Sequence, residues 1–293
     1  MIRFSKYIWL YALISLFVLV PGIYSLVRYG FRPSIDFAGG SLVEYRTSAG
    51  VTTAAVQDAA KDAGIDIVSL QKSGNQAFIV RMKQEPQEKL FLLTRGIEQR
   101  ASVSATAVRN ETVGPVLGQE LLSKTLFAAV LAASAILAYV AWAFKNIRFG
   151  VAAVIALLHD LLVVLGSFSL LGHFLGVEVD TLFVTAFLTT MSFSVHDTIV
   201  VFDRIREYTK RDRNRSFEEI CDIALTETMN RSLTNSFTII FMLVALVLMG
   251  GETVKWFVIA LLIGTVSGTY SSPFVATPVL LLWHRWEHKK RRG

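Results

Sequence analysis

The run TLFAAVLAASAILAYVAWAF, Thr125–Phe144, holds 20 consecutive residues without one charged side chain. A helix of about 20 apolar residues crosses the hydrocarbon core of a bilayer, which is roughly 30 Å thick. Outward from this run, five more stretches between charged residues have a similar length and composition. They are Tyr7–Val27, 149–177, 181–202, 232–251 and 256–283. The sequence therefore predicts an α-helical membrane protein with six transmembrane helices.

The composition agrees with this class and excludes several others. Of the 293 residues, 53% are apolar and 18% are charged, against roughly 45–50% and about 25% in soluble domains. The single cysteine, Cys221, excludes an intrachain disulfide framework and a multi-cysteine metal site. The five His residues lack the paired spacing of a zinc site, and no Ser/His/Asp arrangement lies in a water-accessible segment. We therefore expect no enzyme activity, no cofactor and no metal.

The basic residues predict how the chain is oriented in the membrane. More than half of the 29 Lys and Arg residues lie at the N-terminus, in the second and fourth connections between spans, and in the tail 284–293. The positive-inside rule places all of these segments, and hence both termini, in the cytoplasm. This explains the net charge of +6 without nucleic acid. The basic tail is expected to lie beside anionic membrane lipid.

The segment between the first and second spans has a different character. Alternating apolar residues predict strands, and two amphipathic stretches predict helices, in the order βαββαβ. The expected strands are Ser41–Thr47, Ile67–Lys72, Ala77–Met82 and Val103–Thr112, and the expected helices are Thr52–Ala63 and Pro86–Arg100, with a hairpin turn at 73–75. This order is that of the ferredoxin-like α+β motif, in preference to a mere spacer. The predicted domains are a first transmembrane helix (1–30), an extracytoplasmic α+β domain (31–120), a five-helix transmembrane bundle (121–283) and a basic cytoplasmic tail (284–293).

Ionisable groups inside the predicted spans are candidate functional residues, because a buried charge is costly in lipid. Asp160 lies near the middle of the third span, Asp197 lies inside the fourth, and Arg231 begins the fifth. Helical spacing places Thr190 and Ser194 on the face of Asp197, and Asn235 on that of Arg231.

Two interpretations of these residues are open. Asp197 and Arg231 either form a proton-responsive pair, or they serve a structural role as a static ion pair or through interhelical hydrogen bonds. His159 and Asp160 either belong to a relay or hold two helices together. Near the C-terminus, Gly264 and Gly268 predict close helix packing. The two prolines of the last span, Pro273 and Pro278, are expected to bend it.

Five motifs along the chain resemble those of one family. They are IDFAGG (Ile35–Gly40), VGPVLGQEL (Val113–Leu121), ALLHD (Ala156–Asp160), VHDTIVVFDRIRE (Val195–Glu207) and RSLTNS (Arg231–Ser236). In their order they resemble the SecD/SecF family of bacterial Sec protein export, and within it the SecF branch, in the proton-driven resistance-nodulation-division superfamily. The resemblance implies that Asp197 and Arg231 take part in proton conduction. The family usually has Asn at the position of His196, so this titratable neighbour is expected to influence Asp197.

The same resemblance implies a function and its partners. It predicts a translocase subunit of the bacterial inner membrane that uses the proton-motive force, together with SecD, to assist export of a preprotein through the Sec channel SecYEG. Two alternatives stay open: a proton-coupled exporter of small or lipid molecules, and a scaffold subunit without motor activity. Exporters of this superfamily usually have two large external domains and about twice as many spans in one chain.

Overall fold

A computed structural model describes residues 4–48, 50–73, 76–143, 146–212 and 214–292. It divides the chain into two compact units: residues 33–127, and residues 1–32 together with 128–293. The predicted turn residues Gly74 and Asn75 lie outside the described residues. The helices are α1 (Ile8–Tyr29), α2 (Ile35–Ala38), α3 (Thr53–Asp62), α4 (Gln87–Ala101), α5 (Pro115–Ala143), α6 (Ile147–Leu175), α7 (Thr181–Arg211), α8 (Phe217–Met249), α9 (Glu252–Ser271) and α10 (Thr277–Arg292).

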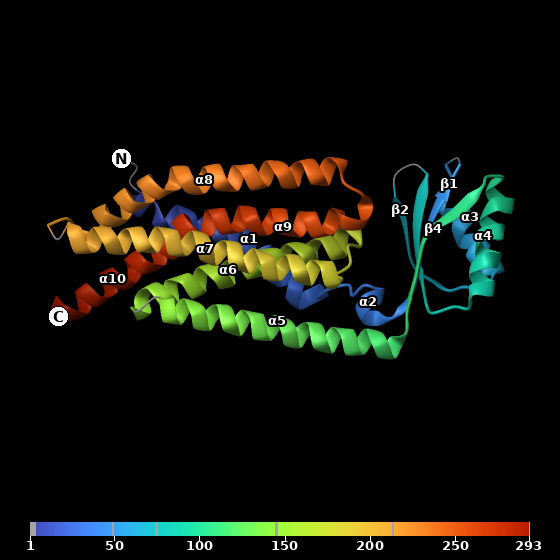
Figure 1. Cartoon of the computed structure of the whole chain (residues 1–293), viewed down its shortest axis with the longest axis horizontal. Coiled ribbons are helices and arrows are strands. Elements are labelled where there is room, and N and C mark those ends of the chain that lie inside the picture. The colour runs from blue at the N-terminus through green and yellow to red at the C-terminus, as the bar shows by residue number, and fades with distance from the viewer. Residues whose placement is uncertain (1–3, 49, 74–75, 144–145, 213, 293) are drawn as a thin grey trace. The chain divides into compact units, whose positions relative to one another are not determined.

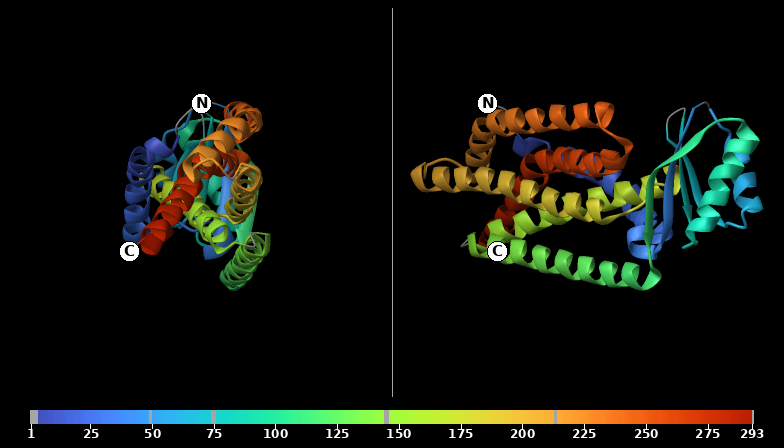
Figure 2. Two further views of the ribbon diagram at one scale, coloured as in Figure 1. Left: turned by 90° about the vertical axis from the view of Figure 1, so that its left-hand side faces the viewer. Right: turned by 45° about the vertical axis from the view of Figure 1, so that its right-hand side comes forward.

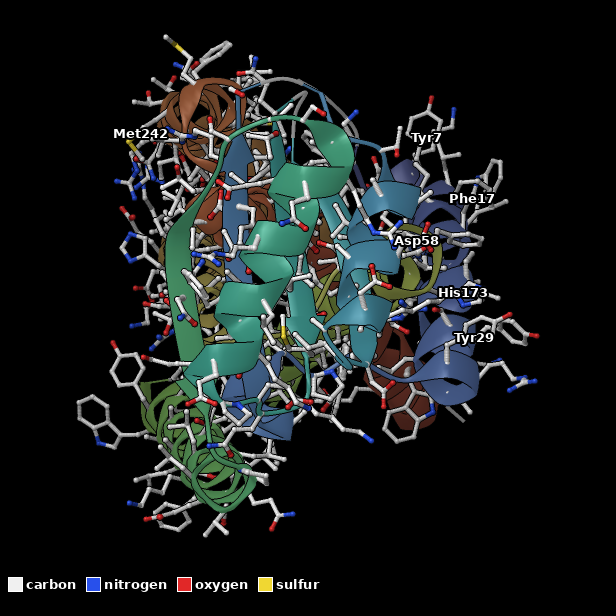
Figure 3. The ribbon with its side chains drawn as sticks, turned by 90° about the vertical axis from the view of Figure 1, so that its right-hand side faces the viewer. Tyr7, Phe17, Tyr29, Asp58, His173 and Met242 are labelled. Atoms are coloured by element: carbon white, nitrogen blue, oxygen red, sulfur yellow. The ribbon has the colours of Figure 1, made fainter. Side chains whose placement is uncertain are left out.

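Within the described residues, six helices are long and apolar enough to cross a membrane, which confirms the predicted number of spans. They are α1, α5, α6, α7, α8 and the combined segment Thr253–Glu287. Large apolar side chains project from their outer faces, as Phe17 of α1 and Met242 of α8 show in Figure 3. Phe17 is 78% exposed, which suits a side chain that contacts lipid tails. The chain is a multi-pass membrane protein.

The fifth spanning helix begins earlier than the apolar run predicts. Helix α8 begins at Phe217, so Arg231 lies well inside the helix and not at its start. Ser216 caps the helix by accepting a hydrogen bond from the Glu219 backbone N–H, and the Glu219 side chain accepts one from the Ser216 backbone N–H. This capping box satisfies two free N–H groups and fixes the helix start within polar sequence. A run of uncharged residues therefore marks only the part of the helix that can lie in lipid, and it misses the polar first turns of α8.

Small residues let the spanning helices approach closely. Helix α1 crosses α6 where Gly22 meets Gly166, and a Cβ atom on Gly166 would lie 2.6 Å from the Gly22 Cα. Helix α7 packs along α9, and the right-hand view of Figure 2 shows the two helices side by side. There Gly264 lies against Thr190 and Gly268 against Ser194. The predicted close packing through Gly264 and Gly268 is confirmed.

The last span is interrupted between α9 and α10. Residues Ser272–Ala276 form a π-helical turn, η2, which contains Pro273. Proline lacks a backbone N–H and cannot complete the regular helical ladder, so the turn widens at this point. Two buried serines, Ser271 and Ser272, lie at the start of the interruption.

The unit 33–127 contains a four-stranded antiparallel sheet with two helices on one face. Its strands are β1 (Gly40–Thr47), β2 (Ile67–Ser73), β3 (Ala77–Met82) and β4 (Ala105–Val113), in the spatial order β2-β3-β1-β4. Helices α3 and α4 cover one face, as Figure 1 shows. Val43, Tyr45, Phe78, Val80 and Leu93 pack between sheet and helices, all 1% exposed or less. The ferredoxin-like α+β fold is therefore confirmed.

The short helix α2 was not predicted, and it joins two of the motifs. Ser34 caps it by accepting a hydrogen bond from the Asp36 backbone N–H, and it ends at Gly39. Gly39 has a φ of 74° and lies against Pro115, the first residue of α5. A Cβ on Gly118 would lie 3.0 Å from the Gly39 nitrogen and the Phe37 carbonyl oxygen. Only hydrogen side chains at Gly39 and Gly118 let α2 and α5 approach this closely.

Candidate functional site: polar groups inside the helix bundle

Asp197 is the half-buried carboxylate at which α7 meets α8. Its Oδ1 atom accepts a hydrogen bond of 2.9 Å from the Ser232 hydroxyl of α8. The side chains of His196 and Arg231 act on it electrostatically. Among the described residues, no ion pair within 4.0 Å joins Asp197 to Arg231. Neighbouring residues of a helix point about 100° apart, so Ser232 faces α7 while Arg231 does not.

Asp197 lines two hollows. A cavity of about 270 Å³ lies between α7, α8 and the α9–η2 segment, and its wall is almost entirely apolar around Asp197 and Ser232. A second pocket of about 20 Å³ brings Asp197 together with His196 and Asn235. A space of that size holds about one water molecule, and these three side chains supply polar partners for it. Asp197 therefore borders both an apolar cavity and a small polar pocket.

Arg231 lies on an exposed polar groove of α8. The groove is lined by Glu227, Asn230, Arg231, Thr234, Asn235 and Thr238, at the three- and four-residue spacing of one helix face. Arg231 and Asn235 therefore do share a face, as the sequence predicts. This face is largely exposed. Charged and amide groups on the outside of a membrane helix are costly in lipid, so the face calls for a polar partner.

Thr190 and Ser194 precede Asp197 on the same polar stripe of α7, at intervals of four and three residues. Both are buried and pack against the glycines of α9. The Thr190 hydroxyl donates to the Phe187 carbonyl of its own helix, at 2.8 Å. The Ser194 hydroxyl is buried without a hydrogen-bond partner among the described residues. The stripe drawn from helical spacing therefore lies where α7 meets α9, and at Asp197 it also contacts Ser232 of α8.

His159 and Asp160 form a second buried polar cluster, on α6. Asp160 is 4% exposed, and its carboxylate accepts hydrogen bonds from Ser267, at 2.6 Å, and Ser271, at 2.5 Å. The His159 Nδ1 atom lies 3.0 Å from the Asp160 Oδ1 atom. The cluster therefore does join two helices, α6 and α9.

Several residues of these clusters were not anticipated from the sequence. Ser232, Ser267, Ser271 and Thr198 were missed, because hydroxyl groups are common in membrane helices and carry no charge. One available signal was the four-residue spacing of Ser267 and Ser271, which places both on one face of the last span. Asp222 of α8 was also missed; it is buried and accepts hydrogen bonds from the Ser5 backbone N–H and hydroxyl, at 2.9 Å each.

The spanning helices, the α+β unit and the buried carboxylates define a multi-pass membrane protein with ionisable groups inside its helix bundle. Comparison with known proteins makes the assignment specific. Residues 95–286 match the family described as protein export membrane protein SecD/SecF, C-terminal. Residues 24–51 match the SecD/SecF GG motif. The chain belongs to the SecD/SecF family.

Relatives of similar length support this assignment. The chain is 42% identical to the protein translocase subunit SecF of Thermobaculum terrenum, over 94% of this chain and 92% of that protein. It is 36% identical to the protein translocase subunit SecF of Anaerolinea thermophila, over 97% and 96%.

Two solved structures share the fold. The crystal structure of SecDF, a translocon-associated membrane protein from Thermus thermophilus, has a TM-score of 0.85 and 29% identity over 97% of this chain. A second SecDF structure, in a super-membrane-facing form, has a TM-score of 0.72 and 28% identity over 99%. This chain spans 39% and 40% of the length of those two SecDF chains.

Proposed function

We propose that this chain is a SecF-type subunit of the bacterial Sec protein-export pathway. In this proposal it works with SecD in the inner membrane and uses the proton-motive force to assist passage of a preprotein through SecYEG. The identity to SecF proteins over nearly the full length of both chains supports the pathway and the SecD partner. Binding to SecYEG, the preprotein, lipid and protons is inferred from that role.

The observation that carries the proton-coupling part is the setting of Asp197. A carboxylate inside a spanning helix, held by one serine hydroxyl and bordered by a pocket of water size, can gain and lose a proton. A proton on Asp197 cancels its charge and changes its hydrogen bond with Ser232. Because this bond joins α7 to α8, protonation alters the contact between these two helices. His196 and Asn235 line the path to the carboxylate in this proposal.

The energy available is sufficient for such a step. Moving one charge across a membrane potential yields about 2.3 kcal/mol per 100 mV. This exceeds the roughly 1 kcal/mol that a single hydrogen bond contributes to stability. One proton per step can therefore exchange a hydrogen bond such as Asp197–Ser232, whereas unfolding a large preprotein would need many steps.

The polar groove of α8 supports the partner assignment. Arg231 and Asn235 lie on a helix face exposed in this chain, and a second membrane subunit would remove that face from lipid. We place SecD on this face. Arg231 then acts on Asp197 from the side where the two subunits meet, without forming an ion pair with it.

The test is Asp197→Asn in the complex with SecD, reconstituted into vesicles with SecYEG. Asparagine keeps the shape and still accepts a hydrogen bond from Ser232, so only the exchangeable proton is lost. We expect proton-dependent export and proton flux to fall at least tenfold. The matched control is Asp203→Asn, because Asp203 lies six residues further along α7 and forms an exposed ion pair with Arg206. Near wild-type flux in Asp197→Asn would support the scaffold function instead.

The proposed topology has its own test. Asp58 lies on the exposed side of α3 (Figure 3), and Asn214 lies in the exposed connection between α7 and α8. Single cysteines at these positions, in a chain with Cys221 replaced by Ser, should react with an impermeant thiol reagent from opposite sides of the membrane. Asp58→Cys is expected to react from outside the cytoplasm. Reaction of both from the same side would contradict the placement of the α+β unit outside the cytoplasm.

A further inference from the structure

Asp160 is a buried charged group that the proposed proton step does not use. Three donors or donor-capable atoms surround its two oxygens: the hydroxyls of Ser267 and Ser271 and the Nδ1 atom of His159. Ionised carboxylates only accept hydrogen bonds, and this arrangement of donors suits that form. Asp160 therefore fixes the last turn of α9 to α6, directly before the π-helical turn.

A continuous set of buried contacts leads from Asp160 to Asp197. Ser271 bonds to Asp160, and the next residue, Ser272, has its hydroxyl 3.0 Å from that of Thr198 on α7. Thr198 follows Asp197 directly in the chain, and its hydroxyl also donates to the Ser194 carbonyl. Ser271 and Ser272 are fully buried, and Thr198 is 1% exposed. Solvent does not reach these hydroxyls, so water cannot replace a hydrogen bond that is lost.

The position of the π-helical turn depends on the side-chain hydrogen bonds that hold it to α6 and α7. In η2 the regular backbone ladder is replaced by wider bonds, such as the one from the Thr277 backbone N–H to the Ser272 carbonyl, and Pro273 supplies no backbone N–H. The hydroxyls of Ser271 and Ser272 both reach back to the Gly268 carbonyl, at 3.3 Å each. Side-chain bonds from α6 and α7 therefore help to set the position of the interrupted turn.

We infer that Asp160 is a positioning residue for Asp197, acting through Ser271, Ser272 and Thr198. The inference rests on the proposed function, since it assigns to Asp197 the exchangeable proton. Asp160 holds α9 at the π-helical turn, the turn holds Thr198, and Thr198 sets the rotation of the α7 turn that carries Asp197. That rotation decides how Asp197 meets Ser232 of α8 and the pocket with His196 and Asn235.

Other groups also act on Asp197, and the experiment must separate them. His196 lies beside it on α7, Arg231 acts from α8, the Tyr270 hydroxyl of α9 shares the apolar cavity, and α6 contributes Asp160 and His159 themselves. A change of charge at Asp160 could influence Asp197 directly through space. Removing the Ser272 hydroxyl changes no charge; it breaks the proposed connection to Thr198, together with the longer contact to the Gly268 carbonyl of the same span.

The experiment is an infrared titration of the Asp197 carboxyl in the reconstituted complex with SecD, its band identified by its loss in Asp197→Asn. A hydrogen bond contributes about 1 kcal/mol, so we expect Asp160→Asn, Ser272→Ala and Thr198→Val each to move the titration midpoint by about 0.5 to 1 pH unit. Thr198→Ser keeps the hydroxyl and should restore the wild-type midpoint. Thr189→Val is the matched control, because among the described residues the Thr189 hydroxyl bonds to the Thr185 carbonyl of its own helix and to no other group.

A double-variant comparison decides between the two routes. If the connection runs through Ser272, Asp160→Asn should produce little further shift in a chain that already carries Ser272→Ala. An undiminished shift in that background would show a direct charge effect and overturn the inference. Unchanged midpoints in Ser272→Ala and Thr198→Val would also overturn it, even if Asp160→Asn did not fold. The titration does not depend on transport. The proposed function is tested separately, by whether Asp197→Asn abolishes proton-dependent export.

Discussion

Replacement of Gly166 by alanine tests the close crossing of α1 and α6. The added Cβ would lie 2.6 Å from the Gly22 Cα and 2.9 Å from the Gly22 carbonyl carbon, whereas ordinary contacts begin at 3.4 Å. Both atoms belong to the backbone of α1, so no side-chain rotation can relieve the overlap. The two helices must move apart.

The cost follows from what this separation breaks. Overpacking of a tight interior site costs about 1–3 kcal/mol. One turn further along both helices, the buried Ser25 and Ser169 hydroxyls are 2.9 Å apart, and Ser169 also donates to the Gly30 carbonyl at 2.8 Å. Weakening one of these bonds adds about 1 kcal/mol. We therefore expect Gly166→Ala to lower the free energy of unfolding by about 2–4 kcal/mol.

The assay is reversible unfolding of the full-length protein in mixed micelles with increasing sodium dodecyl sulfate. Gly22→Ala should cost less than Gly166→Ala, because its Cβ would lie 3.1 Å from the nearest Gly166 atom. Gly150→Ala is the control on the same helix, since its added Cβ would meet no other described part of the chain within 4 Å. It should be neutral or up to about 1 kcal/mol stabilising, because alanine favours the helix. The reasoning is refuted if Gly166→Ala is as stable as the wild type, or if Gly150→Ala is equally damaging.

Three further predictions concern other parts of the molecule. Gly118→Ala should separate α2 from α5, increase hydrogen exchange at residues 35–40 and lower the free energy of unfolding by about 1–3 kcal/mol. Gly114→Ala should have little effect, because the nearest neighbour of its added Cβ would be 4.0 Å away. Equal exchange in both variants would contradict the close contact. Ser5→Ala removes one of two hydrogen bonds to the buried Asp222, so it should release the N-terminal segment from α8 and speed limited proteolysis before Ile8, and an unchanged cleavage rate would exclude this anchor. Burial raises the pKa of Tyr45 above its ordinary value, against the opposing hydrogen bond from Thr94. The unfolded chain therefore loses this proton first, and the stability that Tyr45 contributes should decline as the pH rises above about 10. Tyr45→Phe should abolish that part of the decline. The measurement is the difference in unfolding free energy between wild type and variant, at about pH 9 and at about pH 11. A difference that does not change with pH would contradict the raised pKa of Tyr45.

Much of the fold could be predicted because its signals are local. A stretch such as Thr125–Phe144 must be helical wherever it lies in lipid, since each backbone N–H and C=O must be paired within the segment. The strands of the α+β unit showed the alternation of a sheet with one covered face. Helix α2 escaped prediction because its four residues are too few to show a period. The early start of α8 escaped because a capping box carries no hydrophobic signal.

The candidate site was only partly accessible from the sequence. Asp160, Asp197 and Arg231 could be selected because charges within apolar runs are rare and costly, whatever their neighbours are. Their partners depend on which helix faces meet, and this is settled by contacts between distant segments. Packing of Gly264 and Gly268 turns Thr190 and Ser194 towards α9, and the same rotation of α7 aims Asp197 at Ser232 of α8.

The sequence by itself determined the number of spans, the order of strands and helices in the α+β unit, and the charged residues inside the bundle. Each of these depends on composition or spacing within one segment. Only the tertiary structure decided that Asp197 bonds to Ser232, that Asp160 holds the serines of α9, and that Arg231 lies on an exposed groove. Residues 35 to 111 positions apart form these hydrogen bonds, and no pattern within a single helix specifies the rotation that brings them together.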